Sequence, residues 1–344
     1  MKKIAFFDTK PYDKTYFEKY KDKYGFEFKY YESKLNEDTA KMTAGCDGVV
    51  AFVNDDVNSH VIDRLYDSGI HVIAMRCAGY NNIDFKSAYG KIHVLRVPAY
   101  SPYAVAEHAM AMALTLNRKT HRAYIRTRDF NFSLNGLVGF DLHGKTAGII
   151  GTGKIGRVFI DICRGFGMKV IAYDPYPAEN SGIDYVTLDE LCKNADIISL
   201  HCPLTESTRH IINKKTLSDM KRDAYIINTS RGALIDSEAL LEAIKDEEIG
   251  GAALDVYEEE TELFFEDFSG EIIQDDVLTR LISMPNVLVT SHQAFLTREA
   301  LENIADTTLK NLRDFYEDKP LANEICYHCQ RNQNCKKEHG GRCF

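Results

Sequence analysis

A glycine-rich segment near the middle of the chain, Gly151-Thr152-Gly153-Lys154-Ile155-Gly156, narrows the possible folds more than any other stretch. Residues 145–150 form an apolar run typical of a buried strand, and residues 157–163 have the spacing of an amphipathic helix. A strand, a GxGxxG turn and a helix in this order present backbone N–H groups to the pyrophosphate of a dinucleotide. Standing alone, the pattern is explained equally well by an ordinary glycine turn.

Asp174 favours the dinucleotide interpretation. Residues 168–173 have the character of the next parallel strand, and Asp174 follows them directly. A carboxylate at this position accepts hydrogen bonds from the ribose hydroxyls of NAD, whereas it repels the 2′-phosphate of NADP. Pro175 and Tyr176 come next, with no arginine beside them to receive such a phosphate. The sequence therefore predicts NAD as the cofactor.

The size and charge of the chain argue against several classes of protein. Its 344 residues are enough for two domains, and an apolar content of 44% can fill two cores. A net charge of −9 disfavours nucleic acid or an anionic membrane surface as partner. We find no apolar run long enough to span a membrane, and charges come too early at the N-terminus for a secretory signal. A cytoplasmic location is expected.

Short apolar runs alternate with helical patterns, which is typical of parallel sheets built from βαβ units. In the first region, helices are expected at 58–67 and 82–89, beginning at the N-caps Asn58 and Asn82. Strands are expected there at residues 4–7, 26–30, 49–52, 72–75 and 94–97, and after residue 144 at 147–150, 170–173, 197–201, 225–228, 252–255 and 287–290. The six later strands indicate a doubly wound, dinucleotide-binding sheet.

Two further helices bear on the organisation of the domains. Residues 103–114 are apolar nearly all round, so this helix should be buried at a domain or subunit junction. The last helix, from residue 298 to about 318, has no strand after it and is expected to pack back on the first domain.

Polar residues follow several of the later strands, where open α/β sheets bind their ligands. Each of Arg231, Glu260 and His292 has a plain structural explanation, as a surface ion pair, part of an acidic loop or a core histidine. Their convergence on one crevice, together with Asp255, indicates a catalytic group.

Hydride transfer to a 2-oxo acid would use all three side chains. Arg231 can bind the substrate carboxylate through a planar fork and polarise the carbonyl. His292 can protonate the carbonyl oxygen, and Glu260 can fix its tautomer and favour the imidazolium form. The turn at residues 77–80 in the first region could donate N–H groups to the same carboxylate, although a plain glycine turn explains it as well.

Five segments together resemble the NAD-dependent D-2-hydroxyacid dehydrogenases: 97–109, the Gly151 turn with Asp174, 228–232, 253–260 and 291–295. The resemblance covers about residues 2–325 and is closest to the members that form D-lactate. It implies that Arg231 binds substrate, that His292 is the acid/base and that Glu260 is its partner. It also implies substrate contacts from Phe52, Ala78, Gly79, Tyr100 and Phe295, and NAD contacts from Gly151, Gly153, Lys154, Ile155, Gly156, Asp174, Pro203, Thr229 and Asp255.

The same resemblance implies an α/β fold of two Rossmann-like or flavodoxin-like domains with parallel sheets and an active site in the cleft between them. Residues 1–99 plus 297–325 would form a discontinuous substrate domain, and residues 100–296 the inserted NAD-binding domain. Homodimers or homotetramers are usual in the family. The expected reaction is the fermentative, NADH-dependent reduction of pyruvate to D-lactate. A larger branched-chain 2-oxo acid as substrate, or an NAD-sensing regulatory role, are the alternatives.

The chain departs from the family pattern after about Ile325, where a Cys/His-rich segment, residues 326–344, begins. The four cysteines and two histidines of this segment, beginning with the pair Cys326 and Cys329, could bind zinc or an iron–sulfur cluster, or belong to a mobile tail with reduced thiols. The expected hydride chemistry needs no metal. The other cysteines lie in apolar segments and are expected to be reduced core residues: Cys46, Cys77, Cys163, Cys192 and Cys202.

Overall fold

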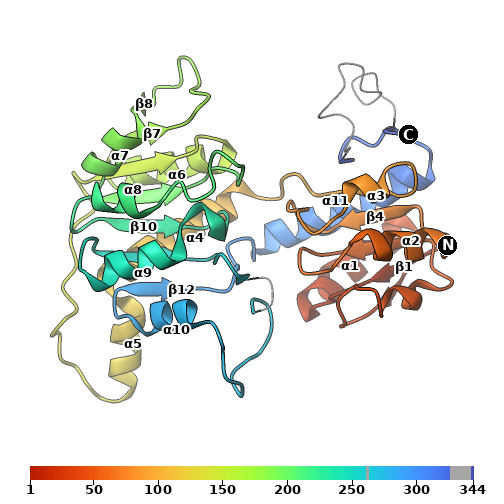
Figure 1. Cartoon of the computed structure of the whole chain (residues 1–344), viewed down its shortest axis with the longest axis horizontal. Coiled ribbons are helices and arrows are strands. Elements are labelled where there is room, and N and C mark those ends of the chain that lie inside the picture. Colours follow the sequence, from red (N-terminus) through yellow and green to blue (C-terminus); the bar gives the residue numbers. More distant parts are fainter. Residues whose placement is uncertain (261–262, 326–341) are drawn as a thin grey trace. The chain divides into compact units, whose positions relative to one another are not determined.

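The computed structural model describes residues 1–260, 263–325 and 342–344, and the chain divides into two compact units (Figure 1). The first unit contains Met1–Ser101 and the segment that starts at Thr297, and the second contains Pro102–Leu296. Both units are built on parallel sheets, so the predicted α/β class is confirmed. In the described part of the chain, no helix combines the length and the apolar character that crossing a membrane requires.

The first unit has a five-stranded sheet in the order β2-β1-β3-β4-β5, the flavodoxin-like arrangement. Every pairing is parallel. All five strands lie at the predicted segments, with ends shifted by at most two residues: β1 (Lys2–Phe6), β2 (Phe26–Tyr30), β3 (Gly48–Ala51), β4 (Val72–Met75) and β5 (His93–Leu95).

The helices of this unit are α1 (Pro11–Tyr24), the short 3-10 helix η1 (Ala40–Thr43), α2 (Ser59–Asp67), α3 (Phe85–Ala88) and α11 (Arg298–Tyr316). Asn58 caps α2 as predicted, because its side-chain oxygen accepts from the N–H groups of His60 at 2.9 Å and Val61 at 3.1 Å. Helix α11 packs on α1 and β4, so the expected return of the chain to the first domain is confirmed.

The predicted helix at 82–89 is wrong in its start. Helix α3 begins at Phe85, and its N-cap is Asp84, whose carboxylate accepts from the Ser87 N–H at 3.1 Å. The Asn82 side chain instead donates to the carbonyls of Phe52 at 2.9 Å and Asp55 at 2.7 Å. Asn82 therefore ties together the loops that follow β3 and β4, a long-range role that a local capping pattern does not reveal.

The second unit has a seven-stranded parallel sheet in the order β12-β11-β10-β9-β6-β7-β8. Its strands are β6 (Thr146–Ile150), β7 (Lys169–Tyr173), β8 (Asp184–Tyr185), β9 (Ile197–Leu200), β10 (Tyr225–Asn228), β11 (Gly251–Leu254) and β12 (Val287–Val289). The six predicted strands are present. Strand β8 was not predicted, because its two residues are too few to show a periodic pattern.

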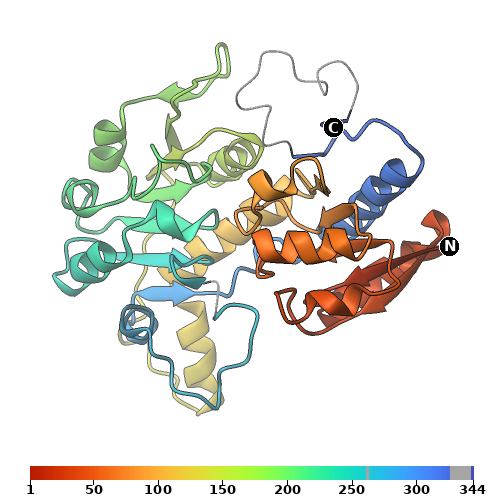
Figure 2. The same ribbon diagram turned by 45° about the vertical axis from the view of Figure 1, so that its right-hand side comes forward.

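Helices cover both faces of this sheet, and the alternation of side chains along the strands divides the core between them. Ile226 faces the helices α7 (Leu188–Asn194), α8 (Lys214–Ser218), α9 (Ser237–Lys245) and α10 (Asp276–Ser283). Its neighbour Ile227 faces α4 (Pro102–Arg118) and α6 (Lys154–Gly165). Figures 1 and 2 show α9 and α4 on opposite sides of the strands. The sheet is therefore doubly wound, as predicted.

Helix α4 is largely buried, as its composition indicated. Ala106, Ala109 and Ala113 are fully buried, whereas Tyr103 is exposed, so small residues form the face that meets α6 and the sheet. A nine-residue helix that follows it, α5 (Thr120–Arg128), was not predicted. None of its residues is buried, so it lacks the apolar stripe that would have marked it in the sequence.

The cysteines of the core are free and buried, as expected for reduced thiols. Burial raises the pKa of the Cys163 thiol to about 12, which leaves it protonated and unreactive. The predicted Cys/His segment lies outside the described residues except for its end. There Phe344 stacks on His93 with ring centroids 4.1 Å apart, and the Cys343 N–H donates to Glu324 at 3.0 Å.

Candidate active site

The predicted site residues of the second unit lie at the carboxyl edge of its sheet, where the C-terminal ends of the parallel strands meet. Gly151 follows β6, Asp174 follows β7, Thr229 follows β10 and Asp255 follows β11. The chain reverses its direction of winding between the neighbouring strands β6 and β9, and ligands of such sheets bind at this switch point.

The glycine turn needs its first and third glycines for steric reasons. Gly151 has a φ of +94°, and a Cβ there would lie 2.6 Å from the backbone nitrogen of Cys202. A Cβ at Gly156 would lie 2.1 Å from the Gly151 carbonyl oxygen, so only glycine allows α6 to start this close to β6.

Helix α6 offers an anion site at its start. Gly153 is its N-cap and provides no side-chain cap. The N–H groups of its first turn, at Lys154, Ile155 and Gly156, are therefore left for another acceptor, as in a pyrophosphate site.

Asp174 is built into this turn. One carboxylate oxygen accepts from the Thr152 N–H at 2.7 Å and the Thr152 hydroxyl at 2.8 Å, and the other accepts from the Tyr176 N–H at 2.9 Å. Partial burial raises the pKa of Asp174, but these hydrogen bonds outweigh it and hold the pKa below its ordinary value. The carboxylate is therefore charged at neutral pH. Thr152 was not predicted, although it lies inside the motif.

Two residues at the neighbouring strand ends also fit a dinucleotide. The Thr229 hydroxyl is buried and has no hydrogen-bond partner in the part of the chain that the structure describes. Such an orphaned group implies a partner that belongs to a ligand or to water. Pro203, after β9, is exposed, and its carbonyl accepts from the Thr208 hydroxyl at 2.7 Å. Thr229, Asp174 and the glycine turn are thus a chemically suitable set for NAD.

His292 and Glu260 are in direct contact. His292 Nδ1 lies 2.8 Å from Glu260 Oε1, and the second carboxylate oxygen accepts from the Tyr257 N–H at 2.8 Å. The two side chains are about equally accessible, with 22% and 20% exposed. The pairing fixes Nδ1 as the nitrogen bound to the carboxylate and leaves Nε2 for another group.

Asp255 determines the backbone of His292. Its fully buried carboxylate accepts from the N–H groups of Gln293 at 2.9 Å and Ala294 at 2.8 Å, and its carbonyl accepts from the His292 N–H at 2.7 Å. His292 itself has a φ of +51°, which a non-glycine residue adopts only where its surroundings enforce it. Asp255 therefore supports the turn that presents the imidazole.

Arg231 is a half-buried cation without a carboxylate partner among the described residues. Its guanidinium donates to the Ser230 carbonyl at 2.6 Å, and its own carbonyl accepts from the Asn228 side chain at 2.9 Å. Most of its five N–H donors are thus available to an anion that reaches this edge.

The predicted substrate contacts belong to both units. In the first unit Phe52 is 4% exposed, Tyr100 is half-buried, and Ala78 and Gly79 lie half-buried in the loop after β4. In the second unit Phe295 is 9% exposed.

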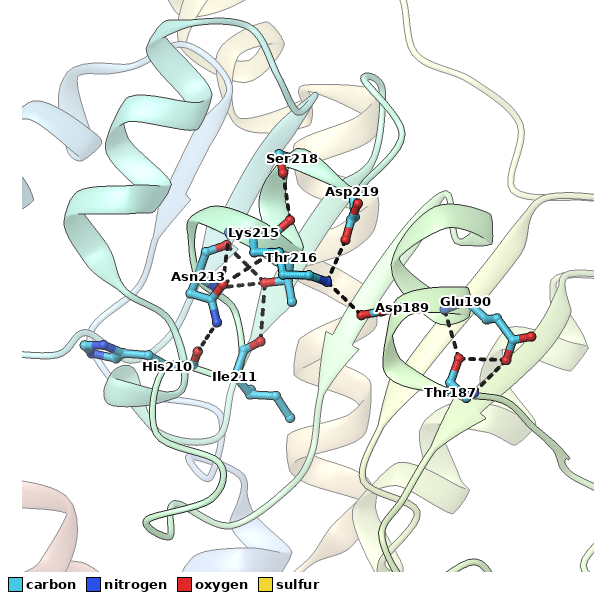
Figure 3. A network of polar contacts seen from close by, with 10 residues as sticks. All are labelled: Thr187, Asp189, Glu190, His210, Ile211, Asn213, Lys215, Thr216, Ser218 and Asp219. Carbon is cyan, nitrogen blue, oxygen red and sulfur yellow. Dashed lines mark hydrogen bonds and ion pairs between the residues drawn. The ribbon is translucent and has the colours of Figure 1, made fainter.

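A second histidine–carboxylate pair was not predicted. His210 Nε2 lies 2.7 Å from Glu258 Oε1, to which Arg209 also donates at 3.0 Å. The His210 carbonyl accepts from the side chain of Asn213, which is the N-cap of α8. The imidazole of His210 points away from the hydrogen bonds around this N-cap (Figure 3). Glu258 lies two residues before Glu260 in the same acidic segment, so the sequence alone could have identified it as a second candidate partner for a histidine. A buried arginine of the first unit, Arg76, was also missed, although it directly follows a predicted strand.

Comparison with known proteins identifies the family. Residues 110–294 match the family described as D-isomer specific 2-hydroxyacid dehydrogenase, NAD binding domain. The chain is 51% identical over 327 residues to a D-lactate dehydrogenase of Escherichia coli, covering 94% of this chain and 99% of that protein.

Solved structures give the same result over the whole fold. The pyruvate reductase of Chlamydomonas reinhardtii matches with a TM-score of 0.90 at 44% identity, covering 94% of this chain and 98% of the other. A D-2-hydroxyisocaproate dehydrogenase matches with a TM-score of 0.84 at 34% identity, covering 94% and 99%. The chain therefore belongs to the D-isomer specific 2-hydroxyacid dehydrogenases, and its cofactor is NAD.

Proposed function

We propose that this protein reduces pyruvate to D-lactate with NADH, with Arg231 binding the substrate carboxylate and His292, paired with Glu260, supplying the proton. The observation that carries the proposal is the contact of 2.8 Å between His292 and Glu260, at the same edge of one sheet as an arginine that lacks a carboxylate partner among the described residues. The identity of 51% to a D-lactate dehydrogenase supports pyruvate as the substrate.

The cofactor side of the site uses the carboxyl edge of the second unit. The N–H groups at the start of α6 bind the pyrophosphate, Asp174 accepts from the ribose hydroxyls, and Thr229, Pro203 and Asp255 complete the site. When bound, NADH supplies the hydride for the carbonyl carbon. In this proposal residues 100–296 form the NAD-binding domain, which also carries Arg231 and His292, and residues 1–99 with 297–325 form the substrate domain.

The proton chemistry belongs to the chain's own residues. His292 Nδ1 is held by Glu260, so Nε2 is the atom that donates a proton to the substrate's carbonyl oxygen and takes it back in the reverse reaction. Glu260 stabilises the imidazolium form, and Arg231 holds the carboxylate with two parallel hydrogen bonds. Phe52, Ala78, Gly79 and Tyr100 of the first unit and Phe295 of the second are the proposed substrate contacts.

The direct test is a panel of 2-oxo acids with NADH and with NADPH, followed by absorbance, with the handedness of the product determined. Pyruvate should be preferred, NADH should exceed NADPH clearly, and the product should be D-lactate. A preference for 4-methyl-2-oxopentanoate would instead favour the branched-chain alternative, which has a relative of 34% identity. Binding of NADH without turnover of any 2-oxo acid would favour a sensing role.

The Asp174 assignment has its own test. Asp174→Ala removes the charge that repels a 2′-phosphate, so the NADH to NADPH ratio of kcat/KM should fall; an unchanged ratio would exclude Asp174 as the ribose acceptor. A cytoplasmic location and a homodimer or homotetramer remain predictions, and light scattering of the purified protein would determine the assembly.

A further inference from the structure

The first unit buries an ion cluster at the carboxyl edge of its sheet. Arg76, directly after β4, is 2% exposed, and the carboxylates of Asp8 and Asp13 beside it are 0% and 3% exposed. Its guanidinium donates to the Asp8 carbonyl at 2.6 Å and lies 3.3 Å from an oxygen of Asp13. Burying such charges costs free energy that an apolar cluster would not, so a role beyond stability is expected.

The guanidinium also lies over the ring of Phe52, a residue of the proposed substrate site. Its central carbon is 3.9 Å from the centroid of the Phe52 ring, within the range of a cation–π contact. The centroid of the Phe6 ring is 5.5 Å from the same carbon. Asp8 and Asp13 hold the arginine while its guanidinium lies over the Phe52 ring.

The backbone of Phe52 is fixed independently of its ring. The Phe52 N–H donates to Asp55 at 2.6 Å, and the Phe52 carbonyl accepts from Asn82 at 2.9 Å. With both backbone groups held by side chains, the remaining freedom of this residue is the orientation of its ring, and Arg76 occupies one face of it.

We propose that Arg76 is a positioning residue that sets the Phe52 ring and thereby the size of the 2-oxo acid that the site accepts. The proposal rests on the proposed function, in which Phe52 lines the substrate site. Arg76 also directly precedes the loop with Ala78 and Gly79, which are two further proposed substrate contacts. Small displacements of such groups change rates strongly, and pocket size discriminates substrates by roughly 10–200-fold per methylene.

Arg76→Lys tests this, because lysine keeps the charge for Asp8 and Asp13 but lacks the planar face. The ratio of kcat/KM for pyruvate to that for 4-methyl-2-oxopentanoate should shift by about tenfold, mainly through KM. Arg313→Lys is the matched control, since Arg313 stacks on Tyr24 at 4.9 Å in the same unit and should leave the ratio unchanged. An unchanged ratio in Arg76→Lys would overturn the proposal.

Two further measurements separate positioning from loss of folding and from failure of the proposed function. In a Phe52→Ala background, Arg76→Lys should cause no additional shift of the ratio, whereas a full additional shift would overturn the proposal. The aromatic NMR signals of the Phe52 ring, assigned with the Phe52→Ala variant, should shift in Arg76→Lys relative to the parent, and unchanged ring signals would overturn the proposal even if no 2-oxo acid were reduced. Absence of turnover in the parent protein would count against the proposed function alone.

Discussion

In the second unit, the His292–Glu260 and His210–Glu258 pairs have nearly the same separation, although His292 uses Nδ1 and His210 uses Nε2. His292 and Glu260 are 2.8 Å apart, His210 and Glu258 are 2.7 Å apart, and both glutamates come from one turn after β11. Both histidines also have a positive φ, of 51° and 49°. Distance and backbone strain therefore do not distinguish a catalytic pair from a structural one.

The surroundings of the two pairs differ. Glu258 is shared with Arg209, so its charge is already compensated and its attraction for His210 is divided. Glu260 has no second cation among the described residues, and its other oxygen accepts only a backbone N–H. The Glu260 carboxylate thus interacts with one imidazole alone, an arrangement that suits the proposed role of His292 as proton donor. We therefore expect substitutions in the His292–Glu260 pair to reduce kcat strongly and substitutions in the His210–Glu258 pair to change it little.

His292→Ala should give the largest effect. Loss of the proposed proton donor should reduce kcat for pyruvate reduction by about 10²–10⁴-fold, the usual range for general acid catalysis. Affinity for NADH, measured by fluorescence titration, should be retained. If kcat of the variant stayed within a few-fold of the parent value, the His292–Glu260 pair would be no more important for turnover than the His210–Glu258 pair, and His292 would not be the proton donor.

Glu260→Gln should have the next largest effect. Glutamine can still accept from Nδ1 and keeps the shape of the side chain, but it lacks the charge that stabilises the imidazolium. We expect kcat to fall by roughly 10²-fold, less than for loss of the histidine itself. Steady-state kinetics at neutral pH provide the measurement, and the same kcat in parent and variant would show that the charge of Glu260 is unnecessary.

Glu258→Gln is the matched variant at the other pair. It should leave kcat within a few-fold of the parent and lower the free energy of unfolding by about 1 kcal/mol, since the partners His210 and Arg209 are partly exposed and screened by water. Urea unfolding followed by circular dichroism measures the loss. A fall in kcat as large as that of Glu260→Gln would contradict the distinction between the pairs.

The sequence predicts one pair and misses the other for a physical reason. Strand ends can be recognised from apolar runs, so residues that directly follow them, such as Arg231 and His292, can be assigned to one edge of a sheet. His210 follows no strand, and its contact with Glu258 spans 48 positions. Arg76 was accessible by the strand-end rule, but its role depends on Asp8, Asp13 and Phe52, which only the folded sheet brings together. Asn82 was wrongly predicted to cap a helix because its actual partners, the carbonyls of Phe52 and Asp55, are also far from it in the sequence.

His201 is a third histidine of the second unit, and its substitution should have the smallest effect of all at neutral pH, on stability alone. His201 has no carboxylate partner among the described residues; its Nε2 lies 2.9 Å from the Ser199 hydroxyl, and its Nδ1 is buried without a hydrogen bond there. Although part of the residue is exposed, burial of the ring lowers the pKa of His201 to about 3. The folded state then binds fewer protons than the unfolded state between about pH 6.5 and pH 3, so the contribution of His201 to the free energy of unfolding is complete at neutral pH and is lost as the pH falls.

Between pH 7 and pH 5 the free energy of unfolding should fall by up to about 2 kcal/mol because of His201. His201→Gln removes the titrating group and keeps a side chain that can hydrogen-bond to Ser199, so urea unfolding at the two pH values should show that much less acid destabilisation in the variant. Equal acid destabilisation of parent and variant would mean that the His201 ring accepts a proton in the folded protein, and the absence of a carboxylate would then no longer separate it from the two paired histidines.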